Sequence, residues 1–70
     1  MNYHVDMTWD KNAGVWCAVC DEIPIALESH SFDVLIERVK TATAEILELN
    51  GNMDEEIRLC FKTTHWESIA

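Results

Sequence analysis

The segment Cys17-Ala18-Val19-Cys20 has the spacing of a zinc-ligand pair or a redox dithiol. It lies in a run, Val15 to Asp21, that we predict to be a strand, and strand residues three apart point to opposite faces. No second CxxC or HxxxH motif supplies further ligands. The total of three cysteines is odd, which argues against a disulfide framework. We therefore expect structural cysteines, no metal site and no cofactor.

Residue types that perform acid-base or nucleophilic chemistry are scattered along the chain. His4, His30 and His65 fall on a predicted strand, a loop and the C-terminal tail. The carboxylates cluster at Asp21-Glu22 and Asp54-Glu55-Glu56, next to predicted turns where solvated charge is the ordinary role. No nucleophile elbow or glycine-rich phosphate loop is present. The sequence predicts no catalytic residues and a protein that is not an enzyme.

Charge points to the class of partner. The 70 residues include 13 acidic and five basic side chains, giving a net charge of −8. Such a field repels phosphate backbones and speeds encounter with basic proteins, so we expect no direct binding to nucleic acid. The alternative is that acidity only keeps a small protein soluble. The sequence has no apolar run of about 20 residues and no signal peptide at its start, so we expect a cytoplasmic protein without membrane contact.

Alternating apolar residues indicate a β-hairpin at the start of the chain. Residues 3–9 alternate with the period of two that is typical of a half-buried strand, and the second strand runs from Val15 to Asp21. Gly14 suits the positive φ of the turn between them. Pairing Trp9 with Val15 collects the strongly apolar side chains on one face, and we adopt this register.

In that register Trp16, Ala18 and Cys20 point away from the helix-covered face. A chain this short buries little surface on its own, and 49% of its residues are hydrophobic. We therefore predict a protein interface at Trp16, Ala18 and Trp66, used by a homodimer or another protein. The alternative is that Trp66 or Ile69 folds back over Trp16 within one chain.

A long helix follows a short edge strand. Ile25 to Ser29 is the predicted strand, and Pro24 suits its start because proline cannot donate to a ladder. Ser31 is a good N-cap for a helix from Phe32 to Leu49, which Asn50-Gly51 closes with a left-handed cap. Its apolar residues recur at helical spacing. We expect the helix to pack through Phe32, Leu35, Ile36, Val39 and Ile46 onto Val5, Met7, Val19, Leu59 and Phe61.

A last strand completes the predicted sheet. After a polar loop at 52–55, residues 57–64 alternate again. The helix returns the chain so that this strand runs parallel to the first strand, and right-handed crossover places it at that edge. The prediction is an α+β, two-layer βββαβ fold with strand order 3-2-1-4 and one long helix on one face.

In addition, the chain resembles the HicB-like antitoxin superfamily, in particular its short uncharacterised single-domain members. The resemblance covers most of the first 51 residues. Its pattern is an acidic turn, an aromatic second strand, a D-x-P-G-like segment and a capped amphipathic helix, and Ile25 replaces the usual glycine after the proline. The stretches that carry it are Trp9-Asp10 to Gly14-Val15-Trp16-Cys17-Ala18, Asp21-Glu22-Ile23-Pro24, Ser31-Phe32-Asp33-Val34-Leu35-Ile36-Glu37-Arg38-Val39 and Glu45-Ile46-Leu47-Glu48-Leu49-Asn50-Gly51.

The resemblance implies one HicB-like domain over residues 1–70, with a sheet related to a truncated RNase H fold. It also implies that the domain neutralises a small basic HicA-like toxin of double-stranded-RNA-binding type that cleaves mRNA. Many HicB antitoxins carry a C-terminal DNA-binding domain, and the sequence to residue 70 shows none. Two other hypotheses remain open: an orphan homodimeric domain with a structural or regulatory role and, as a remote one, a small enzyme.

The cysteine interpretation predicts three free thiols. Thiol titration of the unfolded protein should recover all three without reductant, and the purified protein should contain no zinc. Stoichiometric zinc that is lost on Cys17→Ser would contradict the strand-geometry argument.

Overall fold

Within residues 1–51, 56–63 and 66–69, which the computed structural model describes, the chain forms four strands and one helix. Their order is the predicted βββαβ. The predicted loop at 52–55, Thr64 at the end of the last predicted strand, and His65 lie outside the described residues. The elements are β1 (Asn2–Asp10), β2 (Val15–Cys20), β3 (Ile25–Ser29), α1 (Phe32–Leu49) and β4 (Arg58–Thr63).

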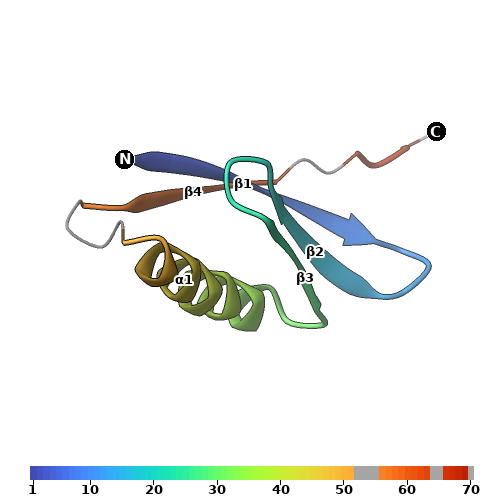
Figure 1. Cartoon of the computed structure of the whole chain (residues 1–70). Helices are drawn as coiled ribbons and strands as arrows, with labels where there is room; N and C mark the ends of the chain where they lie inside the picture. Colours follow the sequence, from blue (N-terminus) through green and yellow to red (C-terminus); the bar gives the residue numbers. More distant parts are fainter. Residues whose placement is uncertain (52–55, 64–65, 70) are drawn as a thin grey trace.

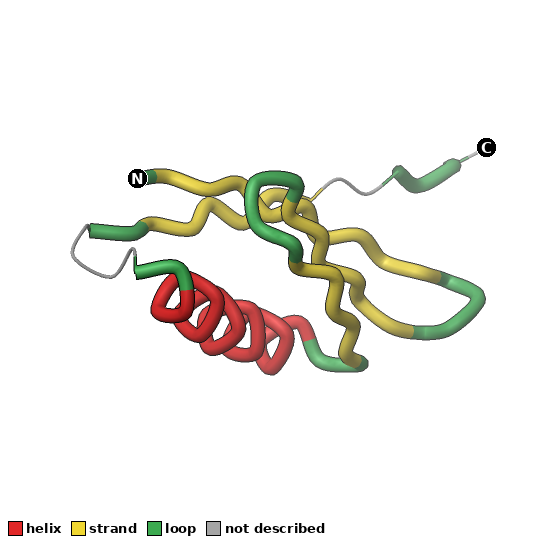
Figure 2. The backbone as a smooth tube through the Cα atoms, in the orientation of Figure 1, coloured by secondary structure: helices red, strands yellow, loops and turns green. Residues whose placement is uncertain are grey.

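The strands form a mixed sheet in the order β3-β2-β1-β4. β1 pairs antiparallel with β2 and parallel with β4, while β2 pairs antiparallel with β3. α1 lies on one face of this sheet, with its C-terminal end toward the start of β4 (Figures 1 and 2). The predicted two-layer α+β architecture and strand order are both confirmed.

The ends of α1 follow the predicted capping chemistry. The Ser31 hydroxyl accepts a hydrogen bond from the Val34 N–H at 3.2 Å, and Asp33 stands in the first turn, where the helix dipole favours a negative charge. At the other end the Asn50 N–H donates to Ile46 O and the Gly51 N–H to Glu48 O. Gly51 has φ 72°, which glycine adopts without strain. The helix bounds were therefore readable from the sequence.

The β1–β2 turn is one residue shorter than predicted. Asp10 pairs with Val15, leaving a four-residue loop in place of five. The Gly14 N–H donates to Asp10 O at 2.8 Å, with Gly14 at φ 66°. The Asp10 carboxylate also accepts the N–H groups of Asn12 and Ala13 at 3.0 and 3.2 Å. Asp10 thus acts as the last ladder residue and as the cap of the turn, which excludes the register predicted from apolar matching.

The shorter turn moves Trp16, Ala18 and Cys20 onto the face covered by the helix, so their predicted outward position is wrong. Trp9 now pairs with Trp16, and their ring centroids are 5.4 Å apart. Trp16 also meets Phe32, the first residue of α1, edge to face at 4.9 Å. This aromatic stack joins the hairpin to the start of the helix.

The hydrophobic core lies between α1 and the middle of the sheet. Val19, predicted to be inside, is 44% exposed on the outer face, because the register change inverts β2. Ile46, Leu59 and Phe61 are partly buried against the core. The buried apolar side chains of the core cluster are Tyr3, Val5, Met7, Ala18, Cys20, Ile23, Ile25, Leu35, Val39 and Leu47. Val15 is also buried, apart from this cluster.

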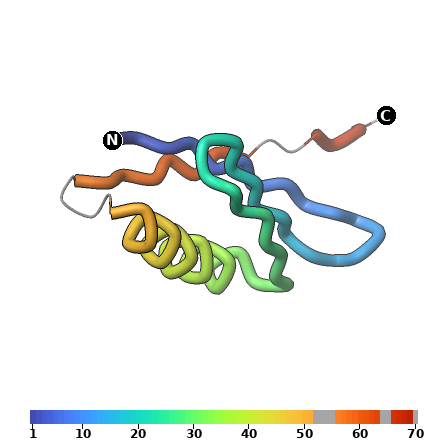
Figure 3. Tube along the Cα trace, in the orientation of Figure 1, coloured from blue at the N-terminus to red at the C-terminus, as the bar shows by residue number. Residues whose placement is uncertain are grey.

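The C-terminal residues 66–69 do not cover the core aromatics. Trp66 is 87% and Ile69 100% exposed, and the segment extends away from α1 beyond the end of β4 (Figure 3). Since Trp16 lies on the helix face, shielding of Trp16 by the tail is also wrong. The tail leaves two large apolar side chains in solvent.

Val39 and Val34 make a matched pair for testing the buried face of α1. Val39 is fully buried, whereas Val34 is 51% exposed on the same helix. Truncation of Val39 to alanine should cost about 2 kcal/mol of unfolding free energy, or roughly 8–16 °C in melting temperature for a domain this small. Val34→Ala should change stability by about 0.5 kcal/mol or less. Equal melting temperatures for the two variants, measured by circular dichroism, would show that the buried face is wrongly assigned.

Candidate protein-binding surface

The structure separates the three residues of the predicted interface. Ala18 has no exposed surface, so it serves the core and cannot touch a partner. Trp16 is partly buried beneath the start of α1. Trp66 remains exposed, as an interface residue would be. Two grooves that flank α1 were not predicted from the sequence. We take these grooves as the candidate protein-binding surface.

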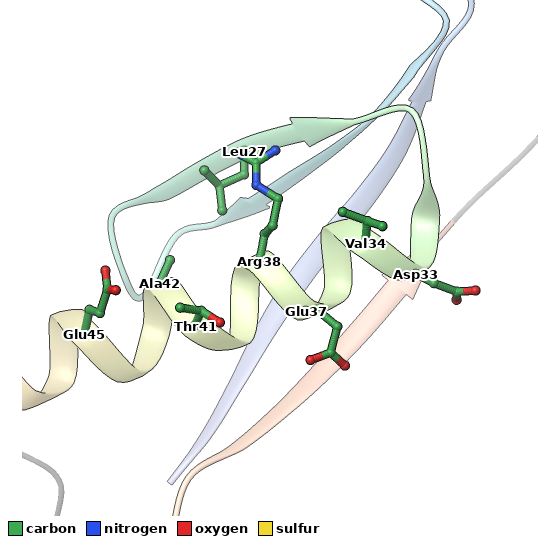
Figure 4. Close-up of a pocket in the computed structure, with 8 residues that line it drawn as sticks. All are labelled: Leu27, Asp33, Val34, Glu37, Arg38, Thr41, Ala42 and Glu45. Atoms are coloured by element: carbon green, nitrogen blue, oxygen red, sulfur yellow. The ribbon is translucent and has the colours of Figure 1, made fainter.

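One groove runs between α1 and β3 and has a volume of about 560 Å³. We call it the α1–β3 groove (Figure 4). Leu27 on β3 and Ala42 on α1 form its apolar part, together with Val34 toward the start of the helix. Polar side chains surround this apolar surface. The lining residues are Leu27, Asp33, Val34, Glu37, Arg38, Thr41, Ala42 and Glu45.

Carboxylates line the helix beside this groove. Asp33, Glu37, Thr41 and Glu45 recur every fourth residue, so each neighbours the next on the helix surface, and the row winds around the helix axis by about 40° per step. Asp33 and Glu45 stand toward opposite ends of the groove, while Glu37 points away from β3 (Figure 4). All three carboxylates are exposed. The spacing that forms this acidic row was visible in the sequence, but its place beside an apolar groove was not.

Few cations neutralise the acidic row. The Lys40 ammonium lies 3.4 Å from the Glu37 carboxylate, an exposed pair that contributes little to stability. Arg38 extends across the groove, and its Nη1 donates to the backbone carbonyl of Glu28 on β3 at 2.6 Å. The guanidinium is thus held against the strand edge. The groove therefore combines apolar contact area with net negative charge, which suits a basic protein segment.

The second groove, with a volume of about 340 Å³, lies between α1 and β4. We call it the α1–β4 groove. It exists because α1 packs chiefly against β3 and β2, which leaves the helix-facing side chains of β4 only partly covered. Thr43 is 3% exposed in its wall, and its hydroxyl has no hydrogen-bond partner among the described residues. The lining residues are Lys40, Thr43, Ala44, Leu47, Ile57, Leu59 and Phe61.

The outer face of the sheet carries no metal-binding arrangement in the described part of the chain. No group of three or more His, Cys, Asp or Glu side chains that could hold an ion occurs there. Cys17 lies on the outer face and Cys20 on the helix face, so the two point apart as the strand geometry requires. Each is a free thiol, as is the exposed Cys60.

A carboxylate predicted to be merely solvated has a structural role on this side. Glu22 Oε1 accepts the His4 backbone N–H at 2.9 Å, beyond the end of the β1–β2 ladder, and lies 3.5 Å from His4 Nδ1. It therefore fastens the β2–β3 connection to β1. No helix among the described residues is long and apolar enough to cross a membrane.

Comparison with known proteins identifies relatives whose function is not assigned. The model of a family described as "Domain of unknown function (DUF1902)" matches residues 2–69. The crystal structure of the hypothetical protein TTHA1013 from the extremely thermophilic bacterium Thermus thermophilus is similar, with a TM-score of 0.81 and 30% identity. The match covers 99% of this chain and 100% of that one. No curated protein gives a significant match.

The unpaired hydroxyl of Thr43 predicts that Thr43→Val stabilises the isolated chain. Valine has the same shape, and a buried hydroxyl without a partner carries a desolvation cost of about 1–3 kcal/mol. The melting temperature should therefore rise, whereas Thr41→Val on the exposed side should change it little. A drop on Thr43→Val would mean that the hydroxyl makes a hydrogen bond in solution.

Proposed function

The chain belongs to the family described as domain of unknown function DUF1902, and we propose that it is a non-enzymatic protein-binding domain resembling a HicB-type antitoxin. Its partner would be a small basic HicA-like toxin that cleaves mRNA, and both would act in the cytoplasm. The observation that carries the proposal is the α1–β3 groove, where exposed carboxylates surround an apolar surface.

Electrostatics supports a basic partner. A toxin that acts on RNA needs a cationic surface for phosphates, and the acidic row offers carboxylates to that surface. Four residues of helix rise about 6 Å, so Asp33, Glu37 and Glu45 extend over roughly 18 Å of α1. The net charge of −8 adds long-range attraction that speeds encounter. The acidic row and the toxin's substrate would then compete for the same cations.

The groove also supplies the apolar contact that charge alone cannot replace. Exposed ion pairs are worth only about 0.2–1 kcal/mol each in water. Val34 is 51% exposed and Leu27 partly buried, so a partner side chain placed between them would remove apolar surface from water. Exclusion of water there would also strengthen the neighbouring charge contacts. A basic side chain with a long aliphatic stem fits both requirements.

The second candidate is an orphan homodimeric domain with a structural or regulatory role. It is favoured by the large apolar side chains that remain exposed, Leu49, Trp66 and Ile69, at 86%, 87% and 100%. Neither candidate requires a catalytic residue or a cofactor. The two differ in what surrounds the gene, because an antitoxin requires a toxin reading frame.

The direct experiment uses the adjacent reading frame. The antitoxin proposal predicts a basic product of about 60–80 residues that arrests growth and cleaves mRNA when expressed alone. Coexpression with this chain should restore growth, and the two proteins should copurify. An adjacent product without toxicity, or toxicity that this chain does not relieve, would contradict the proposal.

Charge removal locates the binding surface. The triple variant Asp33→Asn, Glu37→Gln and Glu45→Gln should raise the Kd for that toxin about tenfold and reduce its salt dependence. The control variant, Asp6→Asn, Asp21→Asn and Glu56→Gln, removes the same charge from other parts of the surface. Equal weakening by both variants, measured by calorimetry, would mean that only net charge matters and that the groove is not the site.

A further inference from the structure

We infer that the free edge of β4 is a self-pairing surface, at which β4 of a second copy adds antiparallel and joins the two sheets into one. This surface is separate from the acidic row, so the inference goes beyond the proposed function and does not depend on a toxin. A sheet in the order β3-β2-β1-β4 has two edges, and the hydrogen bonds of the described residues distinguish them.

The β3 edge is closed. Its five residues follow Pro24, and the Glu28 carbonyl already accepts from Arg38 at 2.6 Å. That bond also shows that the backbone N–H and C=O groups of Glu28 point away from β2, since Arg38 reaches the carbonyl from α1. A strand arriving at this edge would have to displace the guanidinium. Charged side chains that cover an edge in this way are a known protection against strand addition.

The β4 edge has the opposite character. The Arg58 N–H donates to Met1 O at 2.9 Å, so the backbone N–H and C=O groups of Arg58 point toward β1. Those of Cys60 and Lys62 point the same way. Because successive peptide groups of a strand alternate in direction, the N–H and C=O groups of Leu59, Phe61 and Thr63 point to the free edge. No described residue occupies these groups. They are spaced as an antiparallel strand requires.

Side chains on the helix-facing side of β4 also favour pairing. Leu59 and Phe61 are only partly buried and line the α1–β4 groove, which opens at this edge. A two-fold axis through Phe61 sets the two Phe61 rings opposite each other and Leu59 opposite Thr63 of the second copy. Cross-strand aromatic pairs of this kind stabilise sheets. The pairing therefore covers apolar surface that α1 leaves open.

Charge excludes the basic partner of the acidic row as the occupant, while the self-complementary register centred on Phe61 favours a second copy. β4 carries Arg58 and Lys62 on its outer face and no carboxylate, in a chain with only five basic residues. These cations repel a basic protein. In the register centred on Phe61, Lys62 stands opposite Cys60 of the second copy, so no like charges are directly opposed. Asp6 on β1 is paired with Lys62 and offsets its charge.

Proline substitution tests the edge without breaking the internal ladder. The Leu59 N–H faces the free edge, so Leu59→Pro removes no bond to β1 but blocks strand addition. Leu59→Ala controls for the lost side chain. Ala26→Pro is the matched control at the β3 edge, since the Ala26 N–H points outward like that of Glu28, two residues later. Thr63→Pro repeats the test at an exposed side chain, should Leu59→Pro fail to fold.

Sedimentation equilibrium of the full chain gives the result. We expect a native dimer that Ala26→Pro retains, and a Kd for dimerisation that rises at least about tenfold in Leu59→Pro or Thr63→Pro while circular dichroism remains native. Leu59→Ala should weaken the dimer less than Leu59→Pro. A native monomer at about 100 µM, well above a micromolar Kd, would overturn the inference and show that Arg58 and Lys62 protect the edge. A dimer that both β4 proline variants retain would place the interface elsewhere.

Discussion

The turn between β1 and β2 is the constraint on which the rest of the structure depends. Asp10 closes this turn with two sets of hydrogen bonds. Its backbone carbonyl accepts from the Gly14 N–H, and its carboxylate accepts from the N–H groups of Asn12 and Ala13. Gly14 supplies the positive φ that lets the chain enter β2 directly. Because successive side chains of a strand point to opposite faces, the length of this one loop decides which alternate side chains of β2 point toward α1.

From that register follow the core and the surfaces around it. Trp16, Ala18 and Cys20 turn toward α1, and the stack of Trp9, Trp16 and Phe32 joins the hairpin to the start of the helix. α1 then lies over β2 and β3, and the sheet is wider than one helix can cover. The uncovered strips on either side of α1 become the two grooves. The two grooves differ in their lining, since carboxylates border the one beside β3 and mainly apolar side chains line the one beside β4.

The fold was predictable because its signals are local. Period-two alternation identified β1 and β4, the turn residues before Val15 indicated that β2 forms a hairpin with β1, and the N-cap Ser31 with Gly51 at the far end set the bounds of α1. Matching apolar residues could not predict the register. Trp16, which lies on the helix-covered face in the structure, is as hydrophobic as the β2 residues that the match placed on that face. The deciding interaction was the capping role of the Asp10 carboxylate, which a residue count between strands does not reveal.

The candidate site was less predictable than the fold. The spacing of Asp33, Glu37 and Glu45 by four and eight residues was present in the sequence, but any amphipathic helix has a charged side. Whether such a side borders an apolar groove depends on where the helix sits across the sheet, and that depends on the β1–β2 register. Trp66 is exposed, which its predicted place in an interface requires, whereas Ala18 was assigned to the surface only through the wrong register.

Carboxyl footprinting of the complex with the toxin from the adjacent reading frame tests the central claim most directly. Carbodiimide labels exposed carboxylates, and mass spectrometry reports each site in the free and bound protein. The acidic surface beside α1 predicts protection of Asp33, Glu37 and Glu45 on binding, with Asp6 and Asp21 labelled equally in both states. Protection of Asp6 and Asp21 with continued labelling along α1 would contradict it.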